Sequence, residues 1–209
     1  DYIIYELHVG TFTPEGTFQA IIPQLDELKT LGINALELMP VAEFPGRRNW
    51  GYDGVYLYAP SLNYGGVDGL KQLVDAAHQK GLAIFLDVVY NHLGPSGNYL
   101  RAYATEYFTD RYRTPWGEAI NYDGPGNRWV RHFVLQNACY WLNEYHIDGL
   151  RLDATHTIFD SSPKSILQEI VEKARDSVPG RSVVIMAENE NNDVRLIRPI
   201  ARGGYGLDA

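Results

Sequence analysis

The sequence has 209 residues, of which 45% are hydrophobic and 21% charged, and its 26 acidic side chains outnumber 18 basic ones for a formal net charge of −8. This composition argues against a disordered chain. The acidic balance argues against binding to nucleic acid or an anionic membrane, because both favour clustered Lys and Arg. No apolar run approaches the roughly 20 residues that span a bilayer. The single cysteine, Cys139, cannot form an internal disulfide, which favours a reducing compartment and a cytoplasmic location.

Apolar segments typical of strands alternate with amphipathic segments typical of helices along the chain. In chain order the predicted elements are a strand over residues 2–9, a helix over 18–31, a strand over 33–41, a helix over 70–80, a strand over 82–89, a helix over 129–145, a strand over 149–153, a helix over 165–177, a strand over 182–187 and a short helix over 193–200. Residues 42–69 and about 93–127 show no sustained period and are predicted to be long, irregular loops, which are usually functional.

This alternation predicts repeated β-α units and a mostly parallel sheet. A doubly wound open sheet and a (β/α)8 barrel both fit the pattern. No glycine fingerprint follows the first strand, and polar side chains gather where strands end, so the barrel is favoured. A complete barrel has eight strands. Because the sequence supplies five strands and the start of a sixth, residues 1–209 are interpreted as part of one barrel, and the non-Met start agrees with an excerpt.

Three acidic residues, Asp87, Asp153 and Glu188, each stand at the end of a strongly apolar strand. An ionisable group there is costly unless it is paired or hydrogen-bonded. Any one of them alone is explained as a structural carboxylate that caps the following helix. In a parallel barrel, however, the strand ends converge on one face, so the three can become neighbours. Two carboxyls about 5–5.5 Å apart are what retaining glycoside hydrolysis requires.

Arg151 lies two residues before Asp153, so both side chains point to the same side of an extended strand. A guanidinium beside a carboxylate lowers the pKa of that carboxylate, which suits a nucleophile that must be charged at neutral pH. Glu188 would instead need burial to hold the proton that a general acid donates. The alternative for Arg151 and Asp153 is a buried salt bridge that holds the strand in register.

Two histidines and two aromatic residues follow the same strand ends. Neutral imidazoles at His92 and His156 can hydrogen-bond a sugar hydroxyl, whereas no spacing typical of a zinc or calcium site is present, so no metal and no cofactor are predicted. Trp50 and Tyr52 can form a stacking platform for a sugar ring or simply cover the open end of the barrel.

Three motifs in order resemble the signature regions of the α-amylase superfamily, glycoside hydrolase family 13. They are Asp87-Val-Val-Tyr-Asn-His92, Gly149-Leu-Arg-Leu-Asp-Ala154 and Ala187-Glu-Asn189. Residues 5–18 resemble the group that holds branching enzymes, isoamylases and malto-oligosyltrehalose trehalohydrolases. Residues 38–46, 50–55, 91–95 and 114–122 look most like the last of these, and so does His156, where branching enzymes usually have a small residue.

The resemblance implies that Asp153 is the nucleophile and Glu188 the general acid/base. It implies that Tyr52 stacks against the sugar at the cleavage site, that Asp87, His92 and Arg151 shape the same subsite, and that His156 contacts the leaving-group side. The implied substrate is maltooligosyltrehalose or a maltooligosaccharide, and the implied reaction releases trehalose by cleaving the adjacent α-1,4 bond. A third catalytic aspartate, after strand seven, and further β-domains are implied outside residues 1–209.

Other functions remain open at this point. A branching enzyme or an isoamylase-like debranching enzyme of the same superfamily would share the three motifs. An inert glucan-binding fragment is the alternative from another class, since the last part of the barrel is missing. We therefore expect residues 1–209 to be part of a glycoside hydrolase catalytic barrel, with an insertion around 93–127, that is poorly soluble or inactive when isolated.

Overall fold

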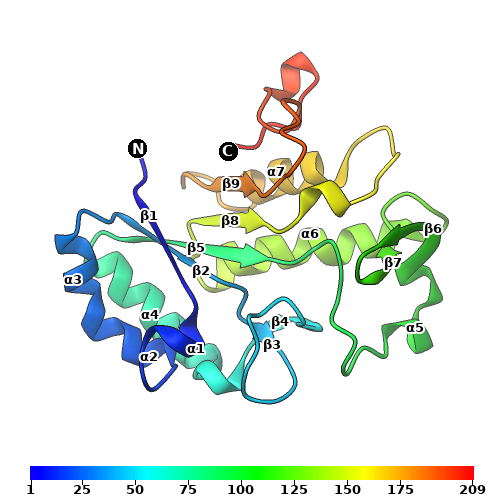
Figure 1. Cartoon of the computed structure of the whole chain (residues 1–209). Coiled ribbons are helices and arrows are strands. Elements are labelled where there is room, and N and C mark those ends of the chain that lie inside the picture. Colours follow the sequence, from blue (N-terminus) through cyan, green and yellow to red (C-terminus); the bar gives the residue numbers. More distant parts are fainter.

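The computed structural model describes residues 1–209, and its centre is a parallel five-stranded sheet (Figure 1). The strands are β1 (Ile4–Leu7), β2 (Ala35–Leu38), β5 (Ala83–Val88), β8 (Gly149–Leu152) and β9 (Val184–Ala187). They lie side by side in chain order, and every neighbouring pair is parallel. A doubly wound sheet reverses its strand order at a switch point. This sheet has no reversal, so the sequential order is that of a barrel.

A sixth segment begins to pair at the open edge of β9. The backbone N–H of Asp208 donates to the carbonyl of Ile185 at 2.8 Å, and the N–H of Ala187 donates to the carbonyl of Ala209 at 2.9 Å. These two bonds lie along the edge where a sixth strand would pair, but residues 203–209 form no strand and the sheet ends at β9. The start of a sixth strand therefore stays a prediction.

Helices and 3-10 turns occupy the connections between strands and the segment after β9. They are α1 (Val9–Phe12), α2 (Phe18–Ile21), η1 (Ile22–Gln24), α3 (Leu25–Thr30), η2 (Leu62–Tyr64), α4 (Gly66–Gln79), α5 (Leu100–Tyr103), η3 (Thr105–Tyr107), α6 (Asn127–Glu144), η4 (Thr155–Thr157), α7 (Ile166–Ser177) and η5 (Ile200–Arg202). The helix predicted over 18–31 is divided into three pieces because Pro23 lacks a backbone donor and sits in a 3-10 turn. No helix of the structure has both the length and the apolar character needed to cross a membrane.

The prediction of a short helix over residues 193–200 is wrong. The segment forms turns, with the N–H of Leu196 bonded to the carbonyl of Asp193 and that of Arg198 to the carbonyl of Val194. Pro199 follows at once, and a proline disfavours helical backbone in the residue before it. The periodic apolar pattern therefore yields a single turn.

The two segments without a period contain small antiparallel sheets. Residues 42–69 hold β3 (Ala42–Glu43) paired with β4 (Tyr56–Pro60), and residues 93–127 hold the hairpin of β6 (Phe108–Thr114) and β7 (Gly117–Ile120). The hairpin stands apart from the main sheet at the side of the molecule (Figure 1). The insertion is thus more regular than its sequence indicates, because β6 has no buried residue and lacks a strong alternation of apolar residues.

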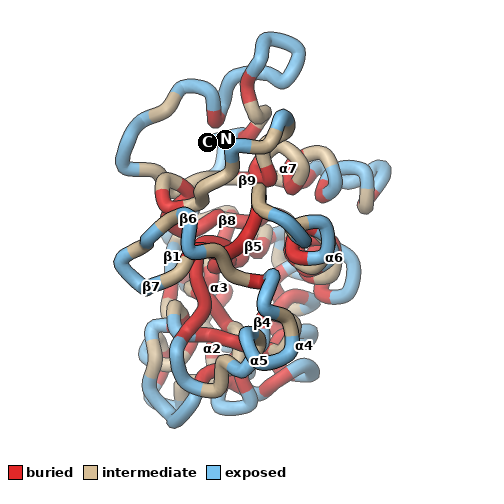
Figure 2. Tube along the Cα trace, turned by 90° about the vertical axis from the view of Figure 1, so that its right-hand side faces the viewer, coloured by how far each residue is buried: buried red, intermediate tan, exposed pale blue.

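Alternate residues of each main strand face two different environments. Leu36, Ile84, Leu150 and Ile185 are fully buried on the face that the helices cover. The residues between them point to the opposite face, which is the inside of the barrel. Figure 2 shows the buried backbone running through the middle of the molecule along β5 and β8. The sheet therefore places Asp87 and Arg151, which are register partners, on its interior face.

Candidate active site

Arg151 is the hub of a cluster of three carboxylates at the C-terminal ends of β5, β8 and β9. Its Nη1 donates to Asp87 Oδ2 at 2.7 Å and to Asp153 Oδ1 at 3.1 Å, and its Nη2 lies 3.4 Å from Glu188 Oε2. Although burial disfavours its charge, the neighbouring Asp87 raises the pKa of Arg151 above its ordinary value. The structure thus brings together all three strand-end acids that the sequence singles out, around one permanent cation.

Asp87 is the most buried member of the cluster, and its side chain is fully inaccessible to solvent. Its Oδ2 accepts hydrogen bonds from Arg151 and, at 2.9 Å, from the hydroxyl of Tyr52, while its Oδ1 has no partner. Burial raises the pKa of Asp87 to about 7, against the opposing effects of Arg151 and of the Tyr52 hydroxyl. Burial and the adjacent Asp87 also raise the pKa of Tyr52, so its phenol remains a donor.

Asp153 differs from the expectation based on its neighbour. The guanidinium of Arg151 does lower the pKa of Asp153, but burial raises it by more, and Glu188 adds to the increase. The expected net lowering of the pKa is therefore wrong. The reason is that the side chain is only 10% exposed, and desolvation disfavours the charged form of a carboxyl even beside a cation.

The segment that follows β8 holds Glu188 through three hydrogen bonds. The backbone N–H of Ala154 donates to its Oε2 at 2.8 Å, and Thr155 donates to its carbonyl through both N–H and hydroxyl, at 2.9 and 2.7 Å. Ala154 has φ +40°, a left-handed backbone conformation that residues other than glycine rarely adopt. The side chain of Glu188 is 43% exposed, so the burial expected for it is not found and the carboxyl faces the open side of the cluster.

A second group of aromatic and imidazole rings lies beside the carboxylates. His92 Nε2 donates to the carbonyl of Tyr52 at 2.9 Å, and burial lowers the pKa of His92, so the ring is neutral near pH 7. The indole of Trp116, in the turn of the β6–β7 hairpin, stacks on His92 with centroids 4.2 Å apart and planes 8° from parallel. Both rings line a cleft of about 450 Å³ together with Asp53. Sequence reasoning missed Trp116 as a site residue, although it falls in the segment 114–122 that carries the resemblance.

The other two sequence candidates lie outside the hydrogen-bonded cluster. His156 is in η4, with a side chain that is 17% exposed and an Nε2 that lies 3.8 Å from Glu190 Oε2. Trp50 is 73% exposed, and its ring neighbour is His8 at 6.5 Å between centroids. No hydrogen bond or ring contact joins Trp50 to the carboxylates. The two residues are therefore placed at the rim rather than within the cluster.

No three or more His, Cys, Asp or Glu residues are grouped so that they could hold an ion. The cluster around Arg151 can still do acid–base and nucleophilic chemistry, because two carboxyls of different exposure share one cation.

Comparisons with known proteins bear directly on this arrangement. The family described as "Alpha amylase, catalytic domain" matches residues 7–117. Seven curated relatives, 42–52% identical, are named malto-oligosyltrehalose trehalohydrolase. The one from Saccharolobus solfataricus is 52% identical over 209 residues, which cover 100% of this chain and 36% of the relative. The chain thus spans about a third of the length of the relatives it matches.

Solved structures share the fold. A structure from Salmonella typhimurium superposes with a TM-score of 0.88 at 47% identity, over 91% of this chain and 32% of that one. The alpha-amylase from Geobacillus thermoleovorans gives a TM-score of 0.80 at 23% identity, over 99% of this chain and 50% of that one, and shows the fold alone. With the sequential strand order, these likenesses identify the sheet as the first five strands of a (β/α)8 barrel. The chain belongs to the α-amylase catalytic-domain family.

Proposed function

We propose that this chain carries the nucleophile and the general acid/base of a retaining glycoside hydrolase that releases trehalose from maltooligosyltrehalose. The observation that carries the proposal is the pairing of Asp153 and Glu188 with one guanidinium, that of Arg151, at adjoining strand ends. Retaining hydrolysis needs two carboxyls beside the same bond. The names of the relatives that match the whole chain support the substrate.

Asp153 and Glu188 divide the chemistry between them. The Asp153 carboxylate attacks the anomeric carbon while Glu188 donates its proton to the leaving glycosidic oxygen, which breaks the α-1,4 bond and leaves a glycosyl ester on Asp153. Glu188, now a carboxylate, then takes a proton from water, which attacks the anomeric carbon and releases Asp153. The 43% exposure of Glu188 and the 10% exposure of Asp153 suit these roles, since the proton donor must reach a leaving group on the open side.

The remaining candidates bind the sugar. Tyr52 offers an aromatic ring whose hydroxyl is fixed by Asp87, and Arg151 holds the nucleophile in place. His92, neutral near pH 7, presents a polar edge without adding charge. Asp87, His92 and Arg151 would thus shape the subsite at the cleaved bond, whereas the exposed ring of Trp50 would contact a glucan that extends to the rim.

His156 is the residue that we assign to the leaving-group side. It follows Asp153 by three residues and lies in η4, next to the Ala154 and Thr155 groups that hold Glu188. A group there contacts what Glu188 protonates, which in this reaction is the released trehalose unit. The residue therefore bears on the choice between hydrolysis at trehalose and transfer to another glucan chain.

The test is incubation of the full-length protein with maltooligosyltrehalose and with amylose. Release of trehalose supports the proposal. Formation of α-1,6 branches on amylose, without trehalose release, would identify a branching enzyme instead. Calorimetric binding of maltooligosaccharides without turnover of either substrate would identify a glucan-binding module, and the Asp153→Ala variant serves as the inactive control.

The proposal also covers the rest of the full-length protein and its location in the cell. We propose that residues 1–209 form part of a catalytic barrel whose other strands and domains lie elsewhere in the full-length protein, because the matched relatives are about three times as long. Cys139 is free and buried, which agrees with the cytoplasmic location expected from the cysteine count. Fractionation of cells that express the tagged full-length protein tests the location.

A further inference from the structure

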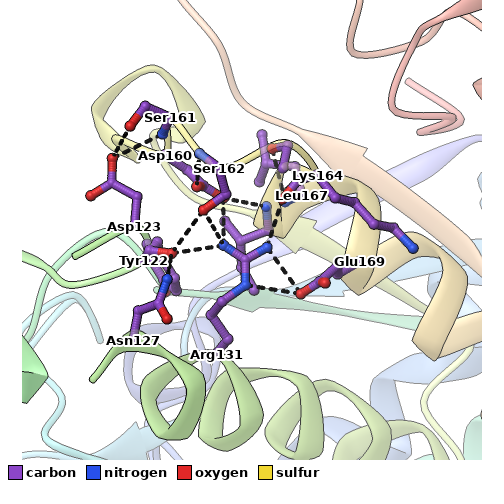
Figure 3. A network of polar contacts seen from close by, with 12 residues as sticks. Tyr122, Asp123, Asn127, Arg131, Asp160, Ser161, Ser162, Lys164, Leu167 and Glu169 are labelled. Carbon is purple, nitrogen blue, oxygen red and sulfur yellow. Dashed lines mark hydrogen bonds and ion pairs between the residues drawn. The ribbon is translucent and has the colours of Figure 1, made fainter. Parts of the chain in front are cut away.

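Arg131 forms the densest polar network of the molecule away from the carboxylate cluster (Figure 3). It lies in the second turn of α6, and its side chain is only 11% exposed. Its guanidinium donates to the Glu169 carboxylate at 3.0 Å and to Asp160 Oδ2 at 2.8 Å, and it also donates to the carbonyls of Tyr122 and Lys164, each at 2.8 Å. The planar guanidinium is the only side chain with enough donors for this set.

Local helix energetics do not explain a cation at this place. The N-terminal end of a helix carries a partial positive charge, which favours acidic rather than basic side chains, and α6 has no acidic residue in its first turn. Burying the charge adds a desolvation cost that only well-placed partners offset. The reason for Arg131 is therefore tertiary, and it is found in the segment that wraps around its guanidinium.

That segment is the loop between β8 and α7, residues 154–165, and Asp160 is its anchor. Asp160 Oδ2 accepts from Arg131 and from the N–H of Ile166, at 2.6 Å, while Oδ1 accepts from the N–H of Ser162 at 2.9 Å. The carbonyl of Lys164 binds the same guanidinium. The second half of the loop is thus curled around one side chain, as Figure 3 shows.

The same loop is also docked on the β6–β7 insertion. Ser161 donates to Asp123 Oδ2 through its N–H and its hydroxyl, at 2.9 and 2.6 Å, and the ring of Phe159 stacks on Tyr112 with centroids 4.9 Å apart. Arg131 binds the carbonyl of Tyr122, next to Asp123. Insertion, helix α6 and loop therefore meet at one place, and Arg131 is the group that contacts all three.

The first half of the loop supports the general acid. It begins at Ala154, whose left-handed φ of +40° aims its N–H at Glu188 Oε2, 2.8 Å away. A non-glycine residue keeps such a conformation only where the surrounding structure over-determines it. Strand β8 fixes Ala154 from one side. On the other side, η4 is tied through Thr155 to the Glu188 carbonyl and through Thr157, whose hydroxyl accepts from Asn91 at 3.2 Å. Beyond η4 the loop is fixed by Phe159, which stacks on Tyr112, and by Asp160, which binds Arg131.

We propose that Arg131 is a positioning residue, which acts through Asp160 to hold the loop of residues 154–165 in the shape that keeps the Ala154 N–H against Glu188. This inference deepens the proposed function and rests on its assignment of Glu188 as the proton donor. Tyr52, Asp87 and His92, to which substrate binding is assigned, lie on other elements. Loss of the clamp should therefore reduce kcat more than it changes KM.

The test is the Arg131→Lys variant of the full-length protein, with Arg181→Lys as its matched control. Lysine keeps the charge but loses the planar set of donors. Arg181 also donates to three backbone carbonyls, those of Leu142, His146 and Ile147 at 2.8–3.1 Å, but it does so at the opposite ends of the strands. Arg131→Lys disturbs two ion pairs and two bonds to backbone carbonyls, whereas Arg181→Lys disturbs three bonds to backbone carbonyls, so the two variants are compared at matched stability. Only Arg131 contacts the loop.

We expect Arg131→Lys to lower kcat by about tenfold or more with KM changed by less than about threefold, since sub-ångström misplacement of a catalytic group has effects of that order. Arg181→Lys should keep kcat even where its melting temperature falls as far. Equal kcat values for the two variants at matched stability would overturn the proposal. If Arg131→Lys changes only KM and leaves kcat as in wild type, the proposal is overturned too.

A double-mutant cycle separates the route through Asp160 from a general loosening. Asp160→Asn alone should lower kcat, and its combination with Arg131→Lys should lower kcat no further, because both break the same clamp. If the losses of kcat in the two single variants add fully in the double variant, Arg131 does not act through Asp160. The kinetics are measured on any α-glucan that the wild-type protein cleaves. An outcome in which wild type cleaves a glucan but releases no trehalose then refutes the proposed function alone.

Discussion

Asp87→Asn isolates the energetic consequence of burying a carboxyl in the Arg151 cluster. Burial raises the pKa of Asp87 from 3.8 to about 7, a difference of about three pKa units at roughly 1.4 kcal/mol each. Between these two values the folded state binds the proton more tightly than the unfolded chain does, so folding stability decreases as the pH rises. Asp87 therefore lowers the stability of this domain by about 4 kcal/mol once the pH exceeds 7, relative to strongly acidic conditions.

Asparagine occupies the same volume and does not titrate, so the variant lacks this pH dependence. About 3 kcal/mol of the total change falls between pH 5 and pH 8. We expect the free energy of unfolding of Asp87→Asn, minus that of wild type, to rise by about 3 kcal/mol from pH 5 to pH 8. The contact of charged Asp87 with Arg151 is already part of what sets the pKa of Asp87, so its loss adds no separate pH dependence to this difference.

Hydrogen exchange of the β5 amides, corrected for the intrinsic effect of pH on exchange, measures the opening free energy of this sheet within the full-length protein. Asp26→Asn is the control, because Asp26 pairs with Lys80 on the surface with a side chain that is 76% exposed, and its difference from wild type should not vary with pH. A difference between Asp87→Asn and wild type that stays constant within about 1 kcal/mol from pH 5 to pH 8 would refute the reasoning.

Three further substitutions probe the site and the sheet. Asp153→Ala should lower kcat by about ten-thousand-fold or more, measured as reducing-sugar release, and retention of wild-type turnover would remove its nucleophile assignment. Trp116→Ala removes the ring stacked on His92 and should raise KM several-fold with kcat nearly constant; a KM equal to that of wild type would contradict a role at the cleft. Gly149→Ala would place a Cβ 2.5 Å from the carbonyl oxygen of Val184, so thermal melting should show a loss of about 1–3 kcal/mol, and an unchanged melting temperature would contradict that packing.

Much of the fold could be predicted because the three central strands, β2, β5 and β8, are buried along most of their length. Continuous apolar runs and the regular return of amphipathic helices indicate parallel β-α units directly. The sequence could not choose between a barrel and a doubly wound sheet on periodicity, since the difference lies in strand order. It also missed the β6–β7 hairpin, because strand Phe108–Thr114 has no buried residue and no apolar face to reveal its period.

The site was predictable to the extent that strand ends converge. Asp87, Arg151 and Asp153 meet because the register of β5 and β8 sets the first two side by side. The stacking of Trp116 on His92 depends on how an insertion folds back, which no local spacing encodes. The net pKa shift of Asp153 was predicted with the wrong sign, because residue spacing reveals its cationic neighbour but not the depth of its burial.

One cation among three carboxylates has a consequence for how the cluster holds protons. With all three ionised, the net charge around Arg151 would be −2 beside a fully buried Asp87, and burial raises the pKa of both Asp87 and Asp153. Such groups titrate as a unit rather than one by one. Retaining hydrolysis needs Asp153 charged and a proton on Glu188 at the same time. Arg151 serves the first of these needs, because its Nη1 contacts Asp153 Oδ1 at 3.1 Å and stabilises the charged carboxylate, whereas its Nη2 lies 3.4 Å from Glu188 Oε2.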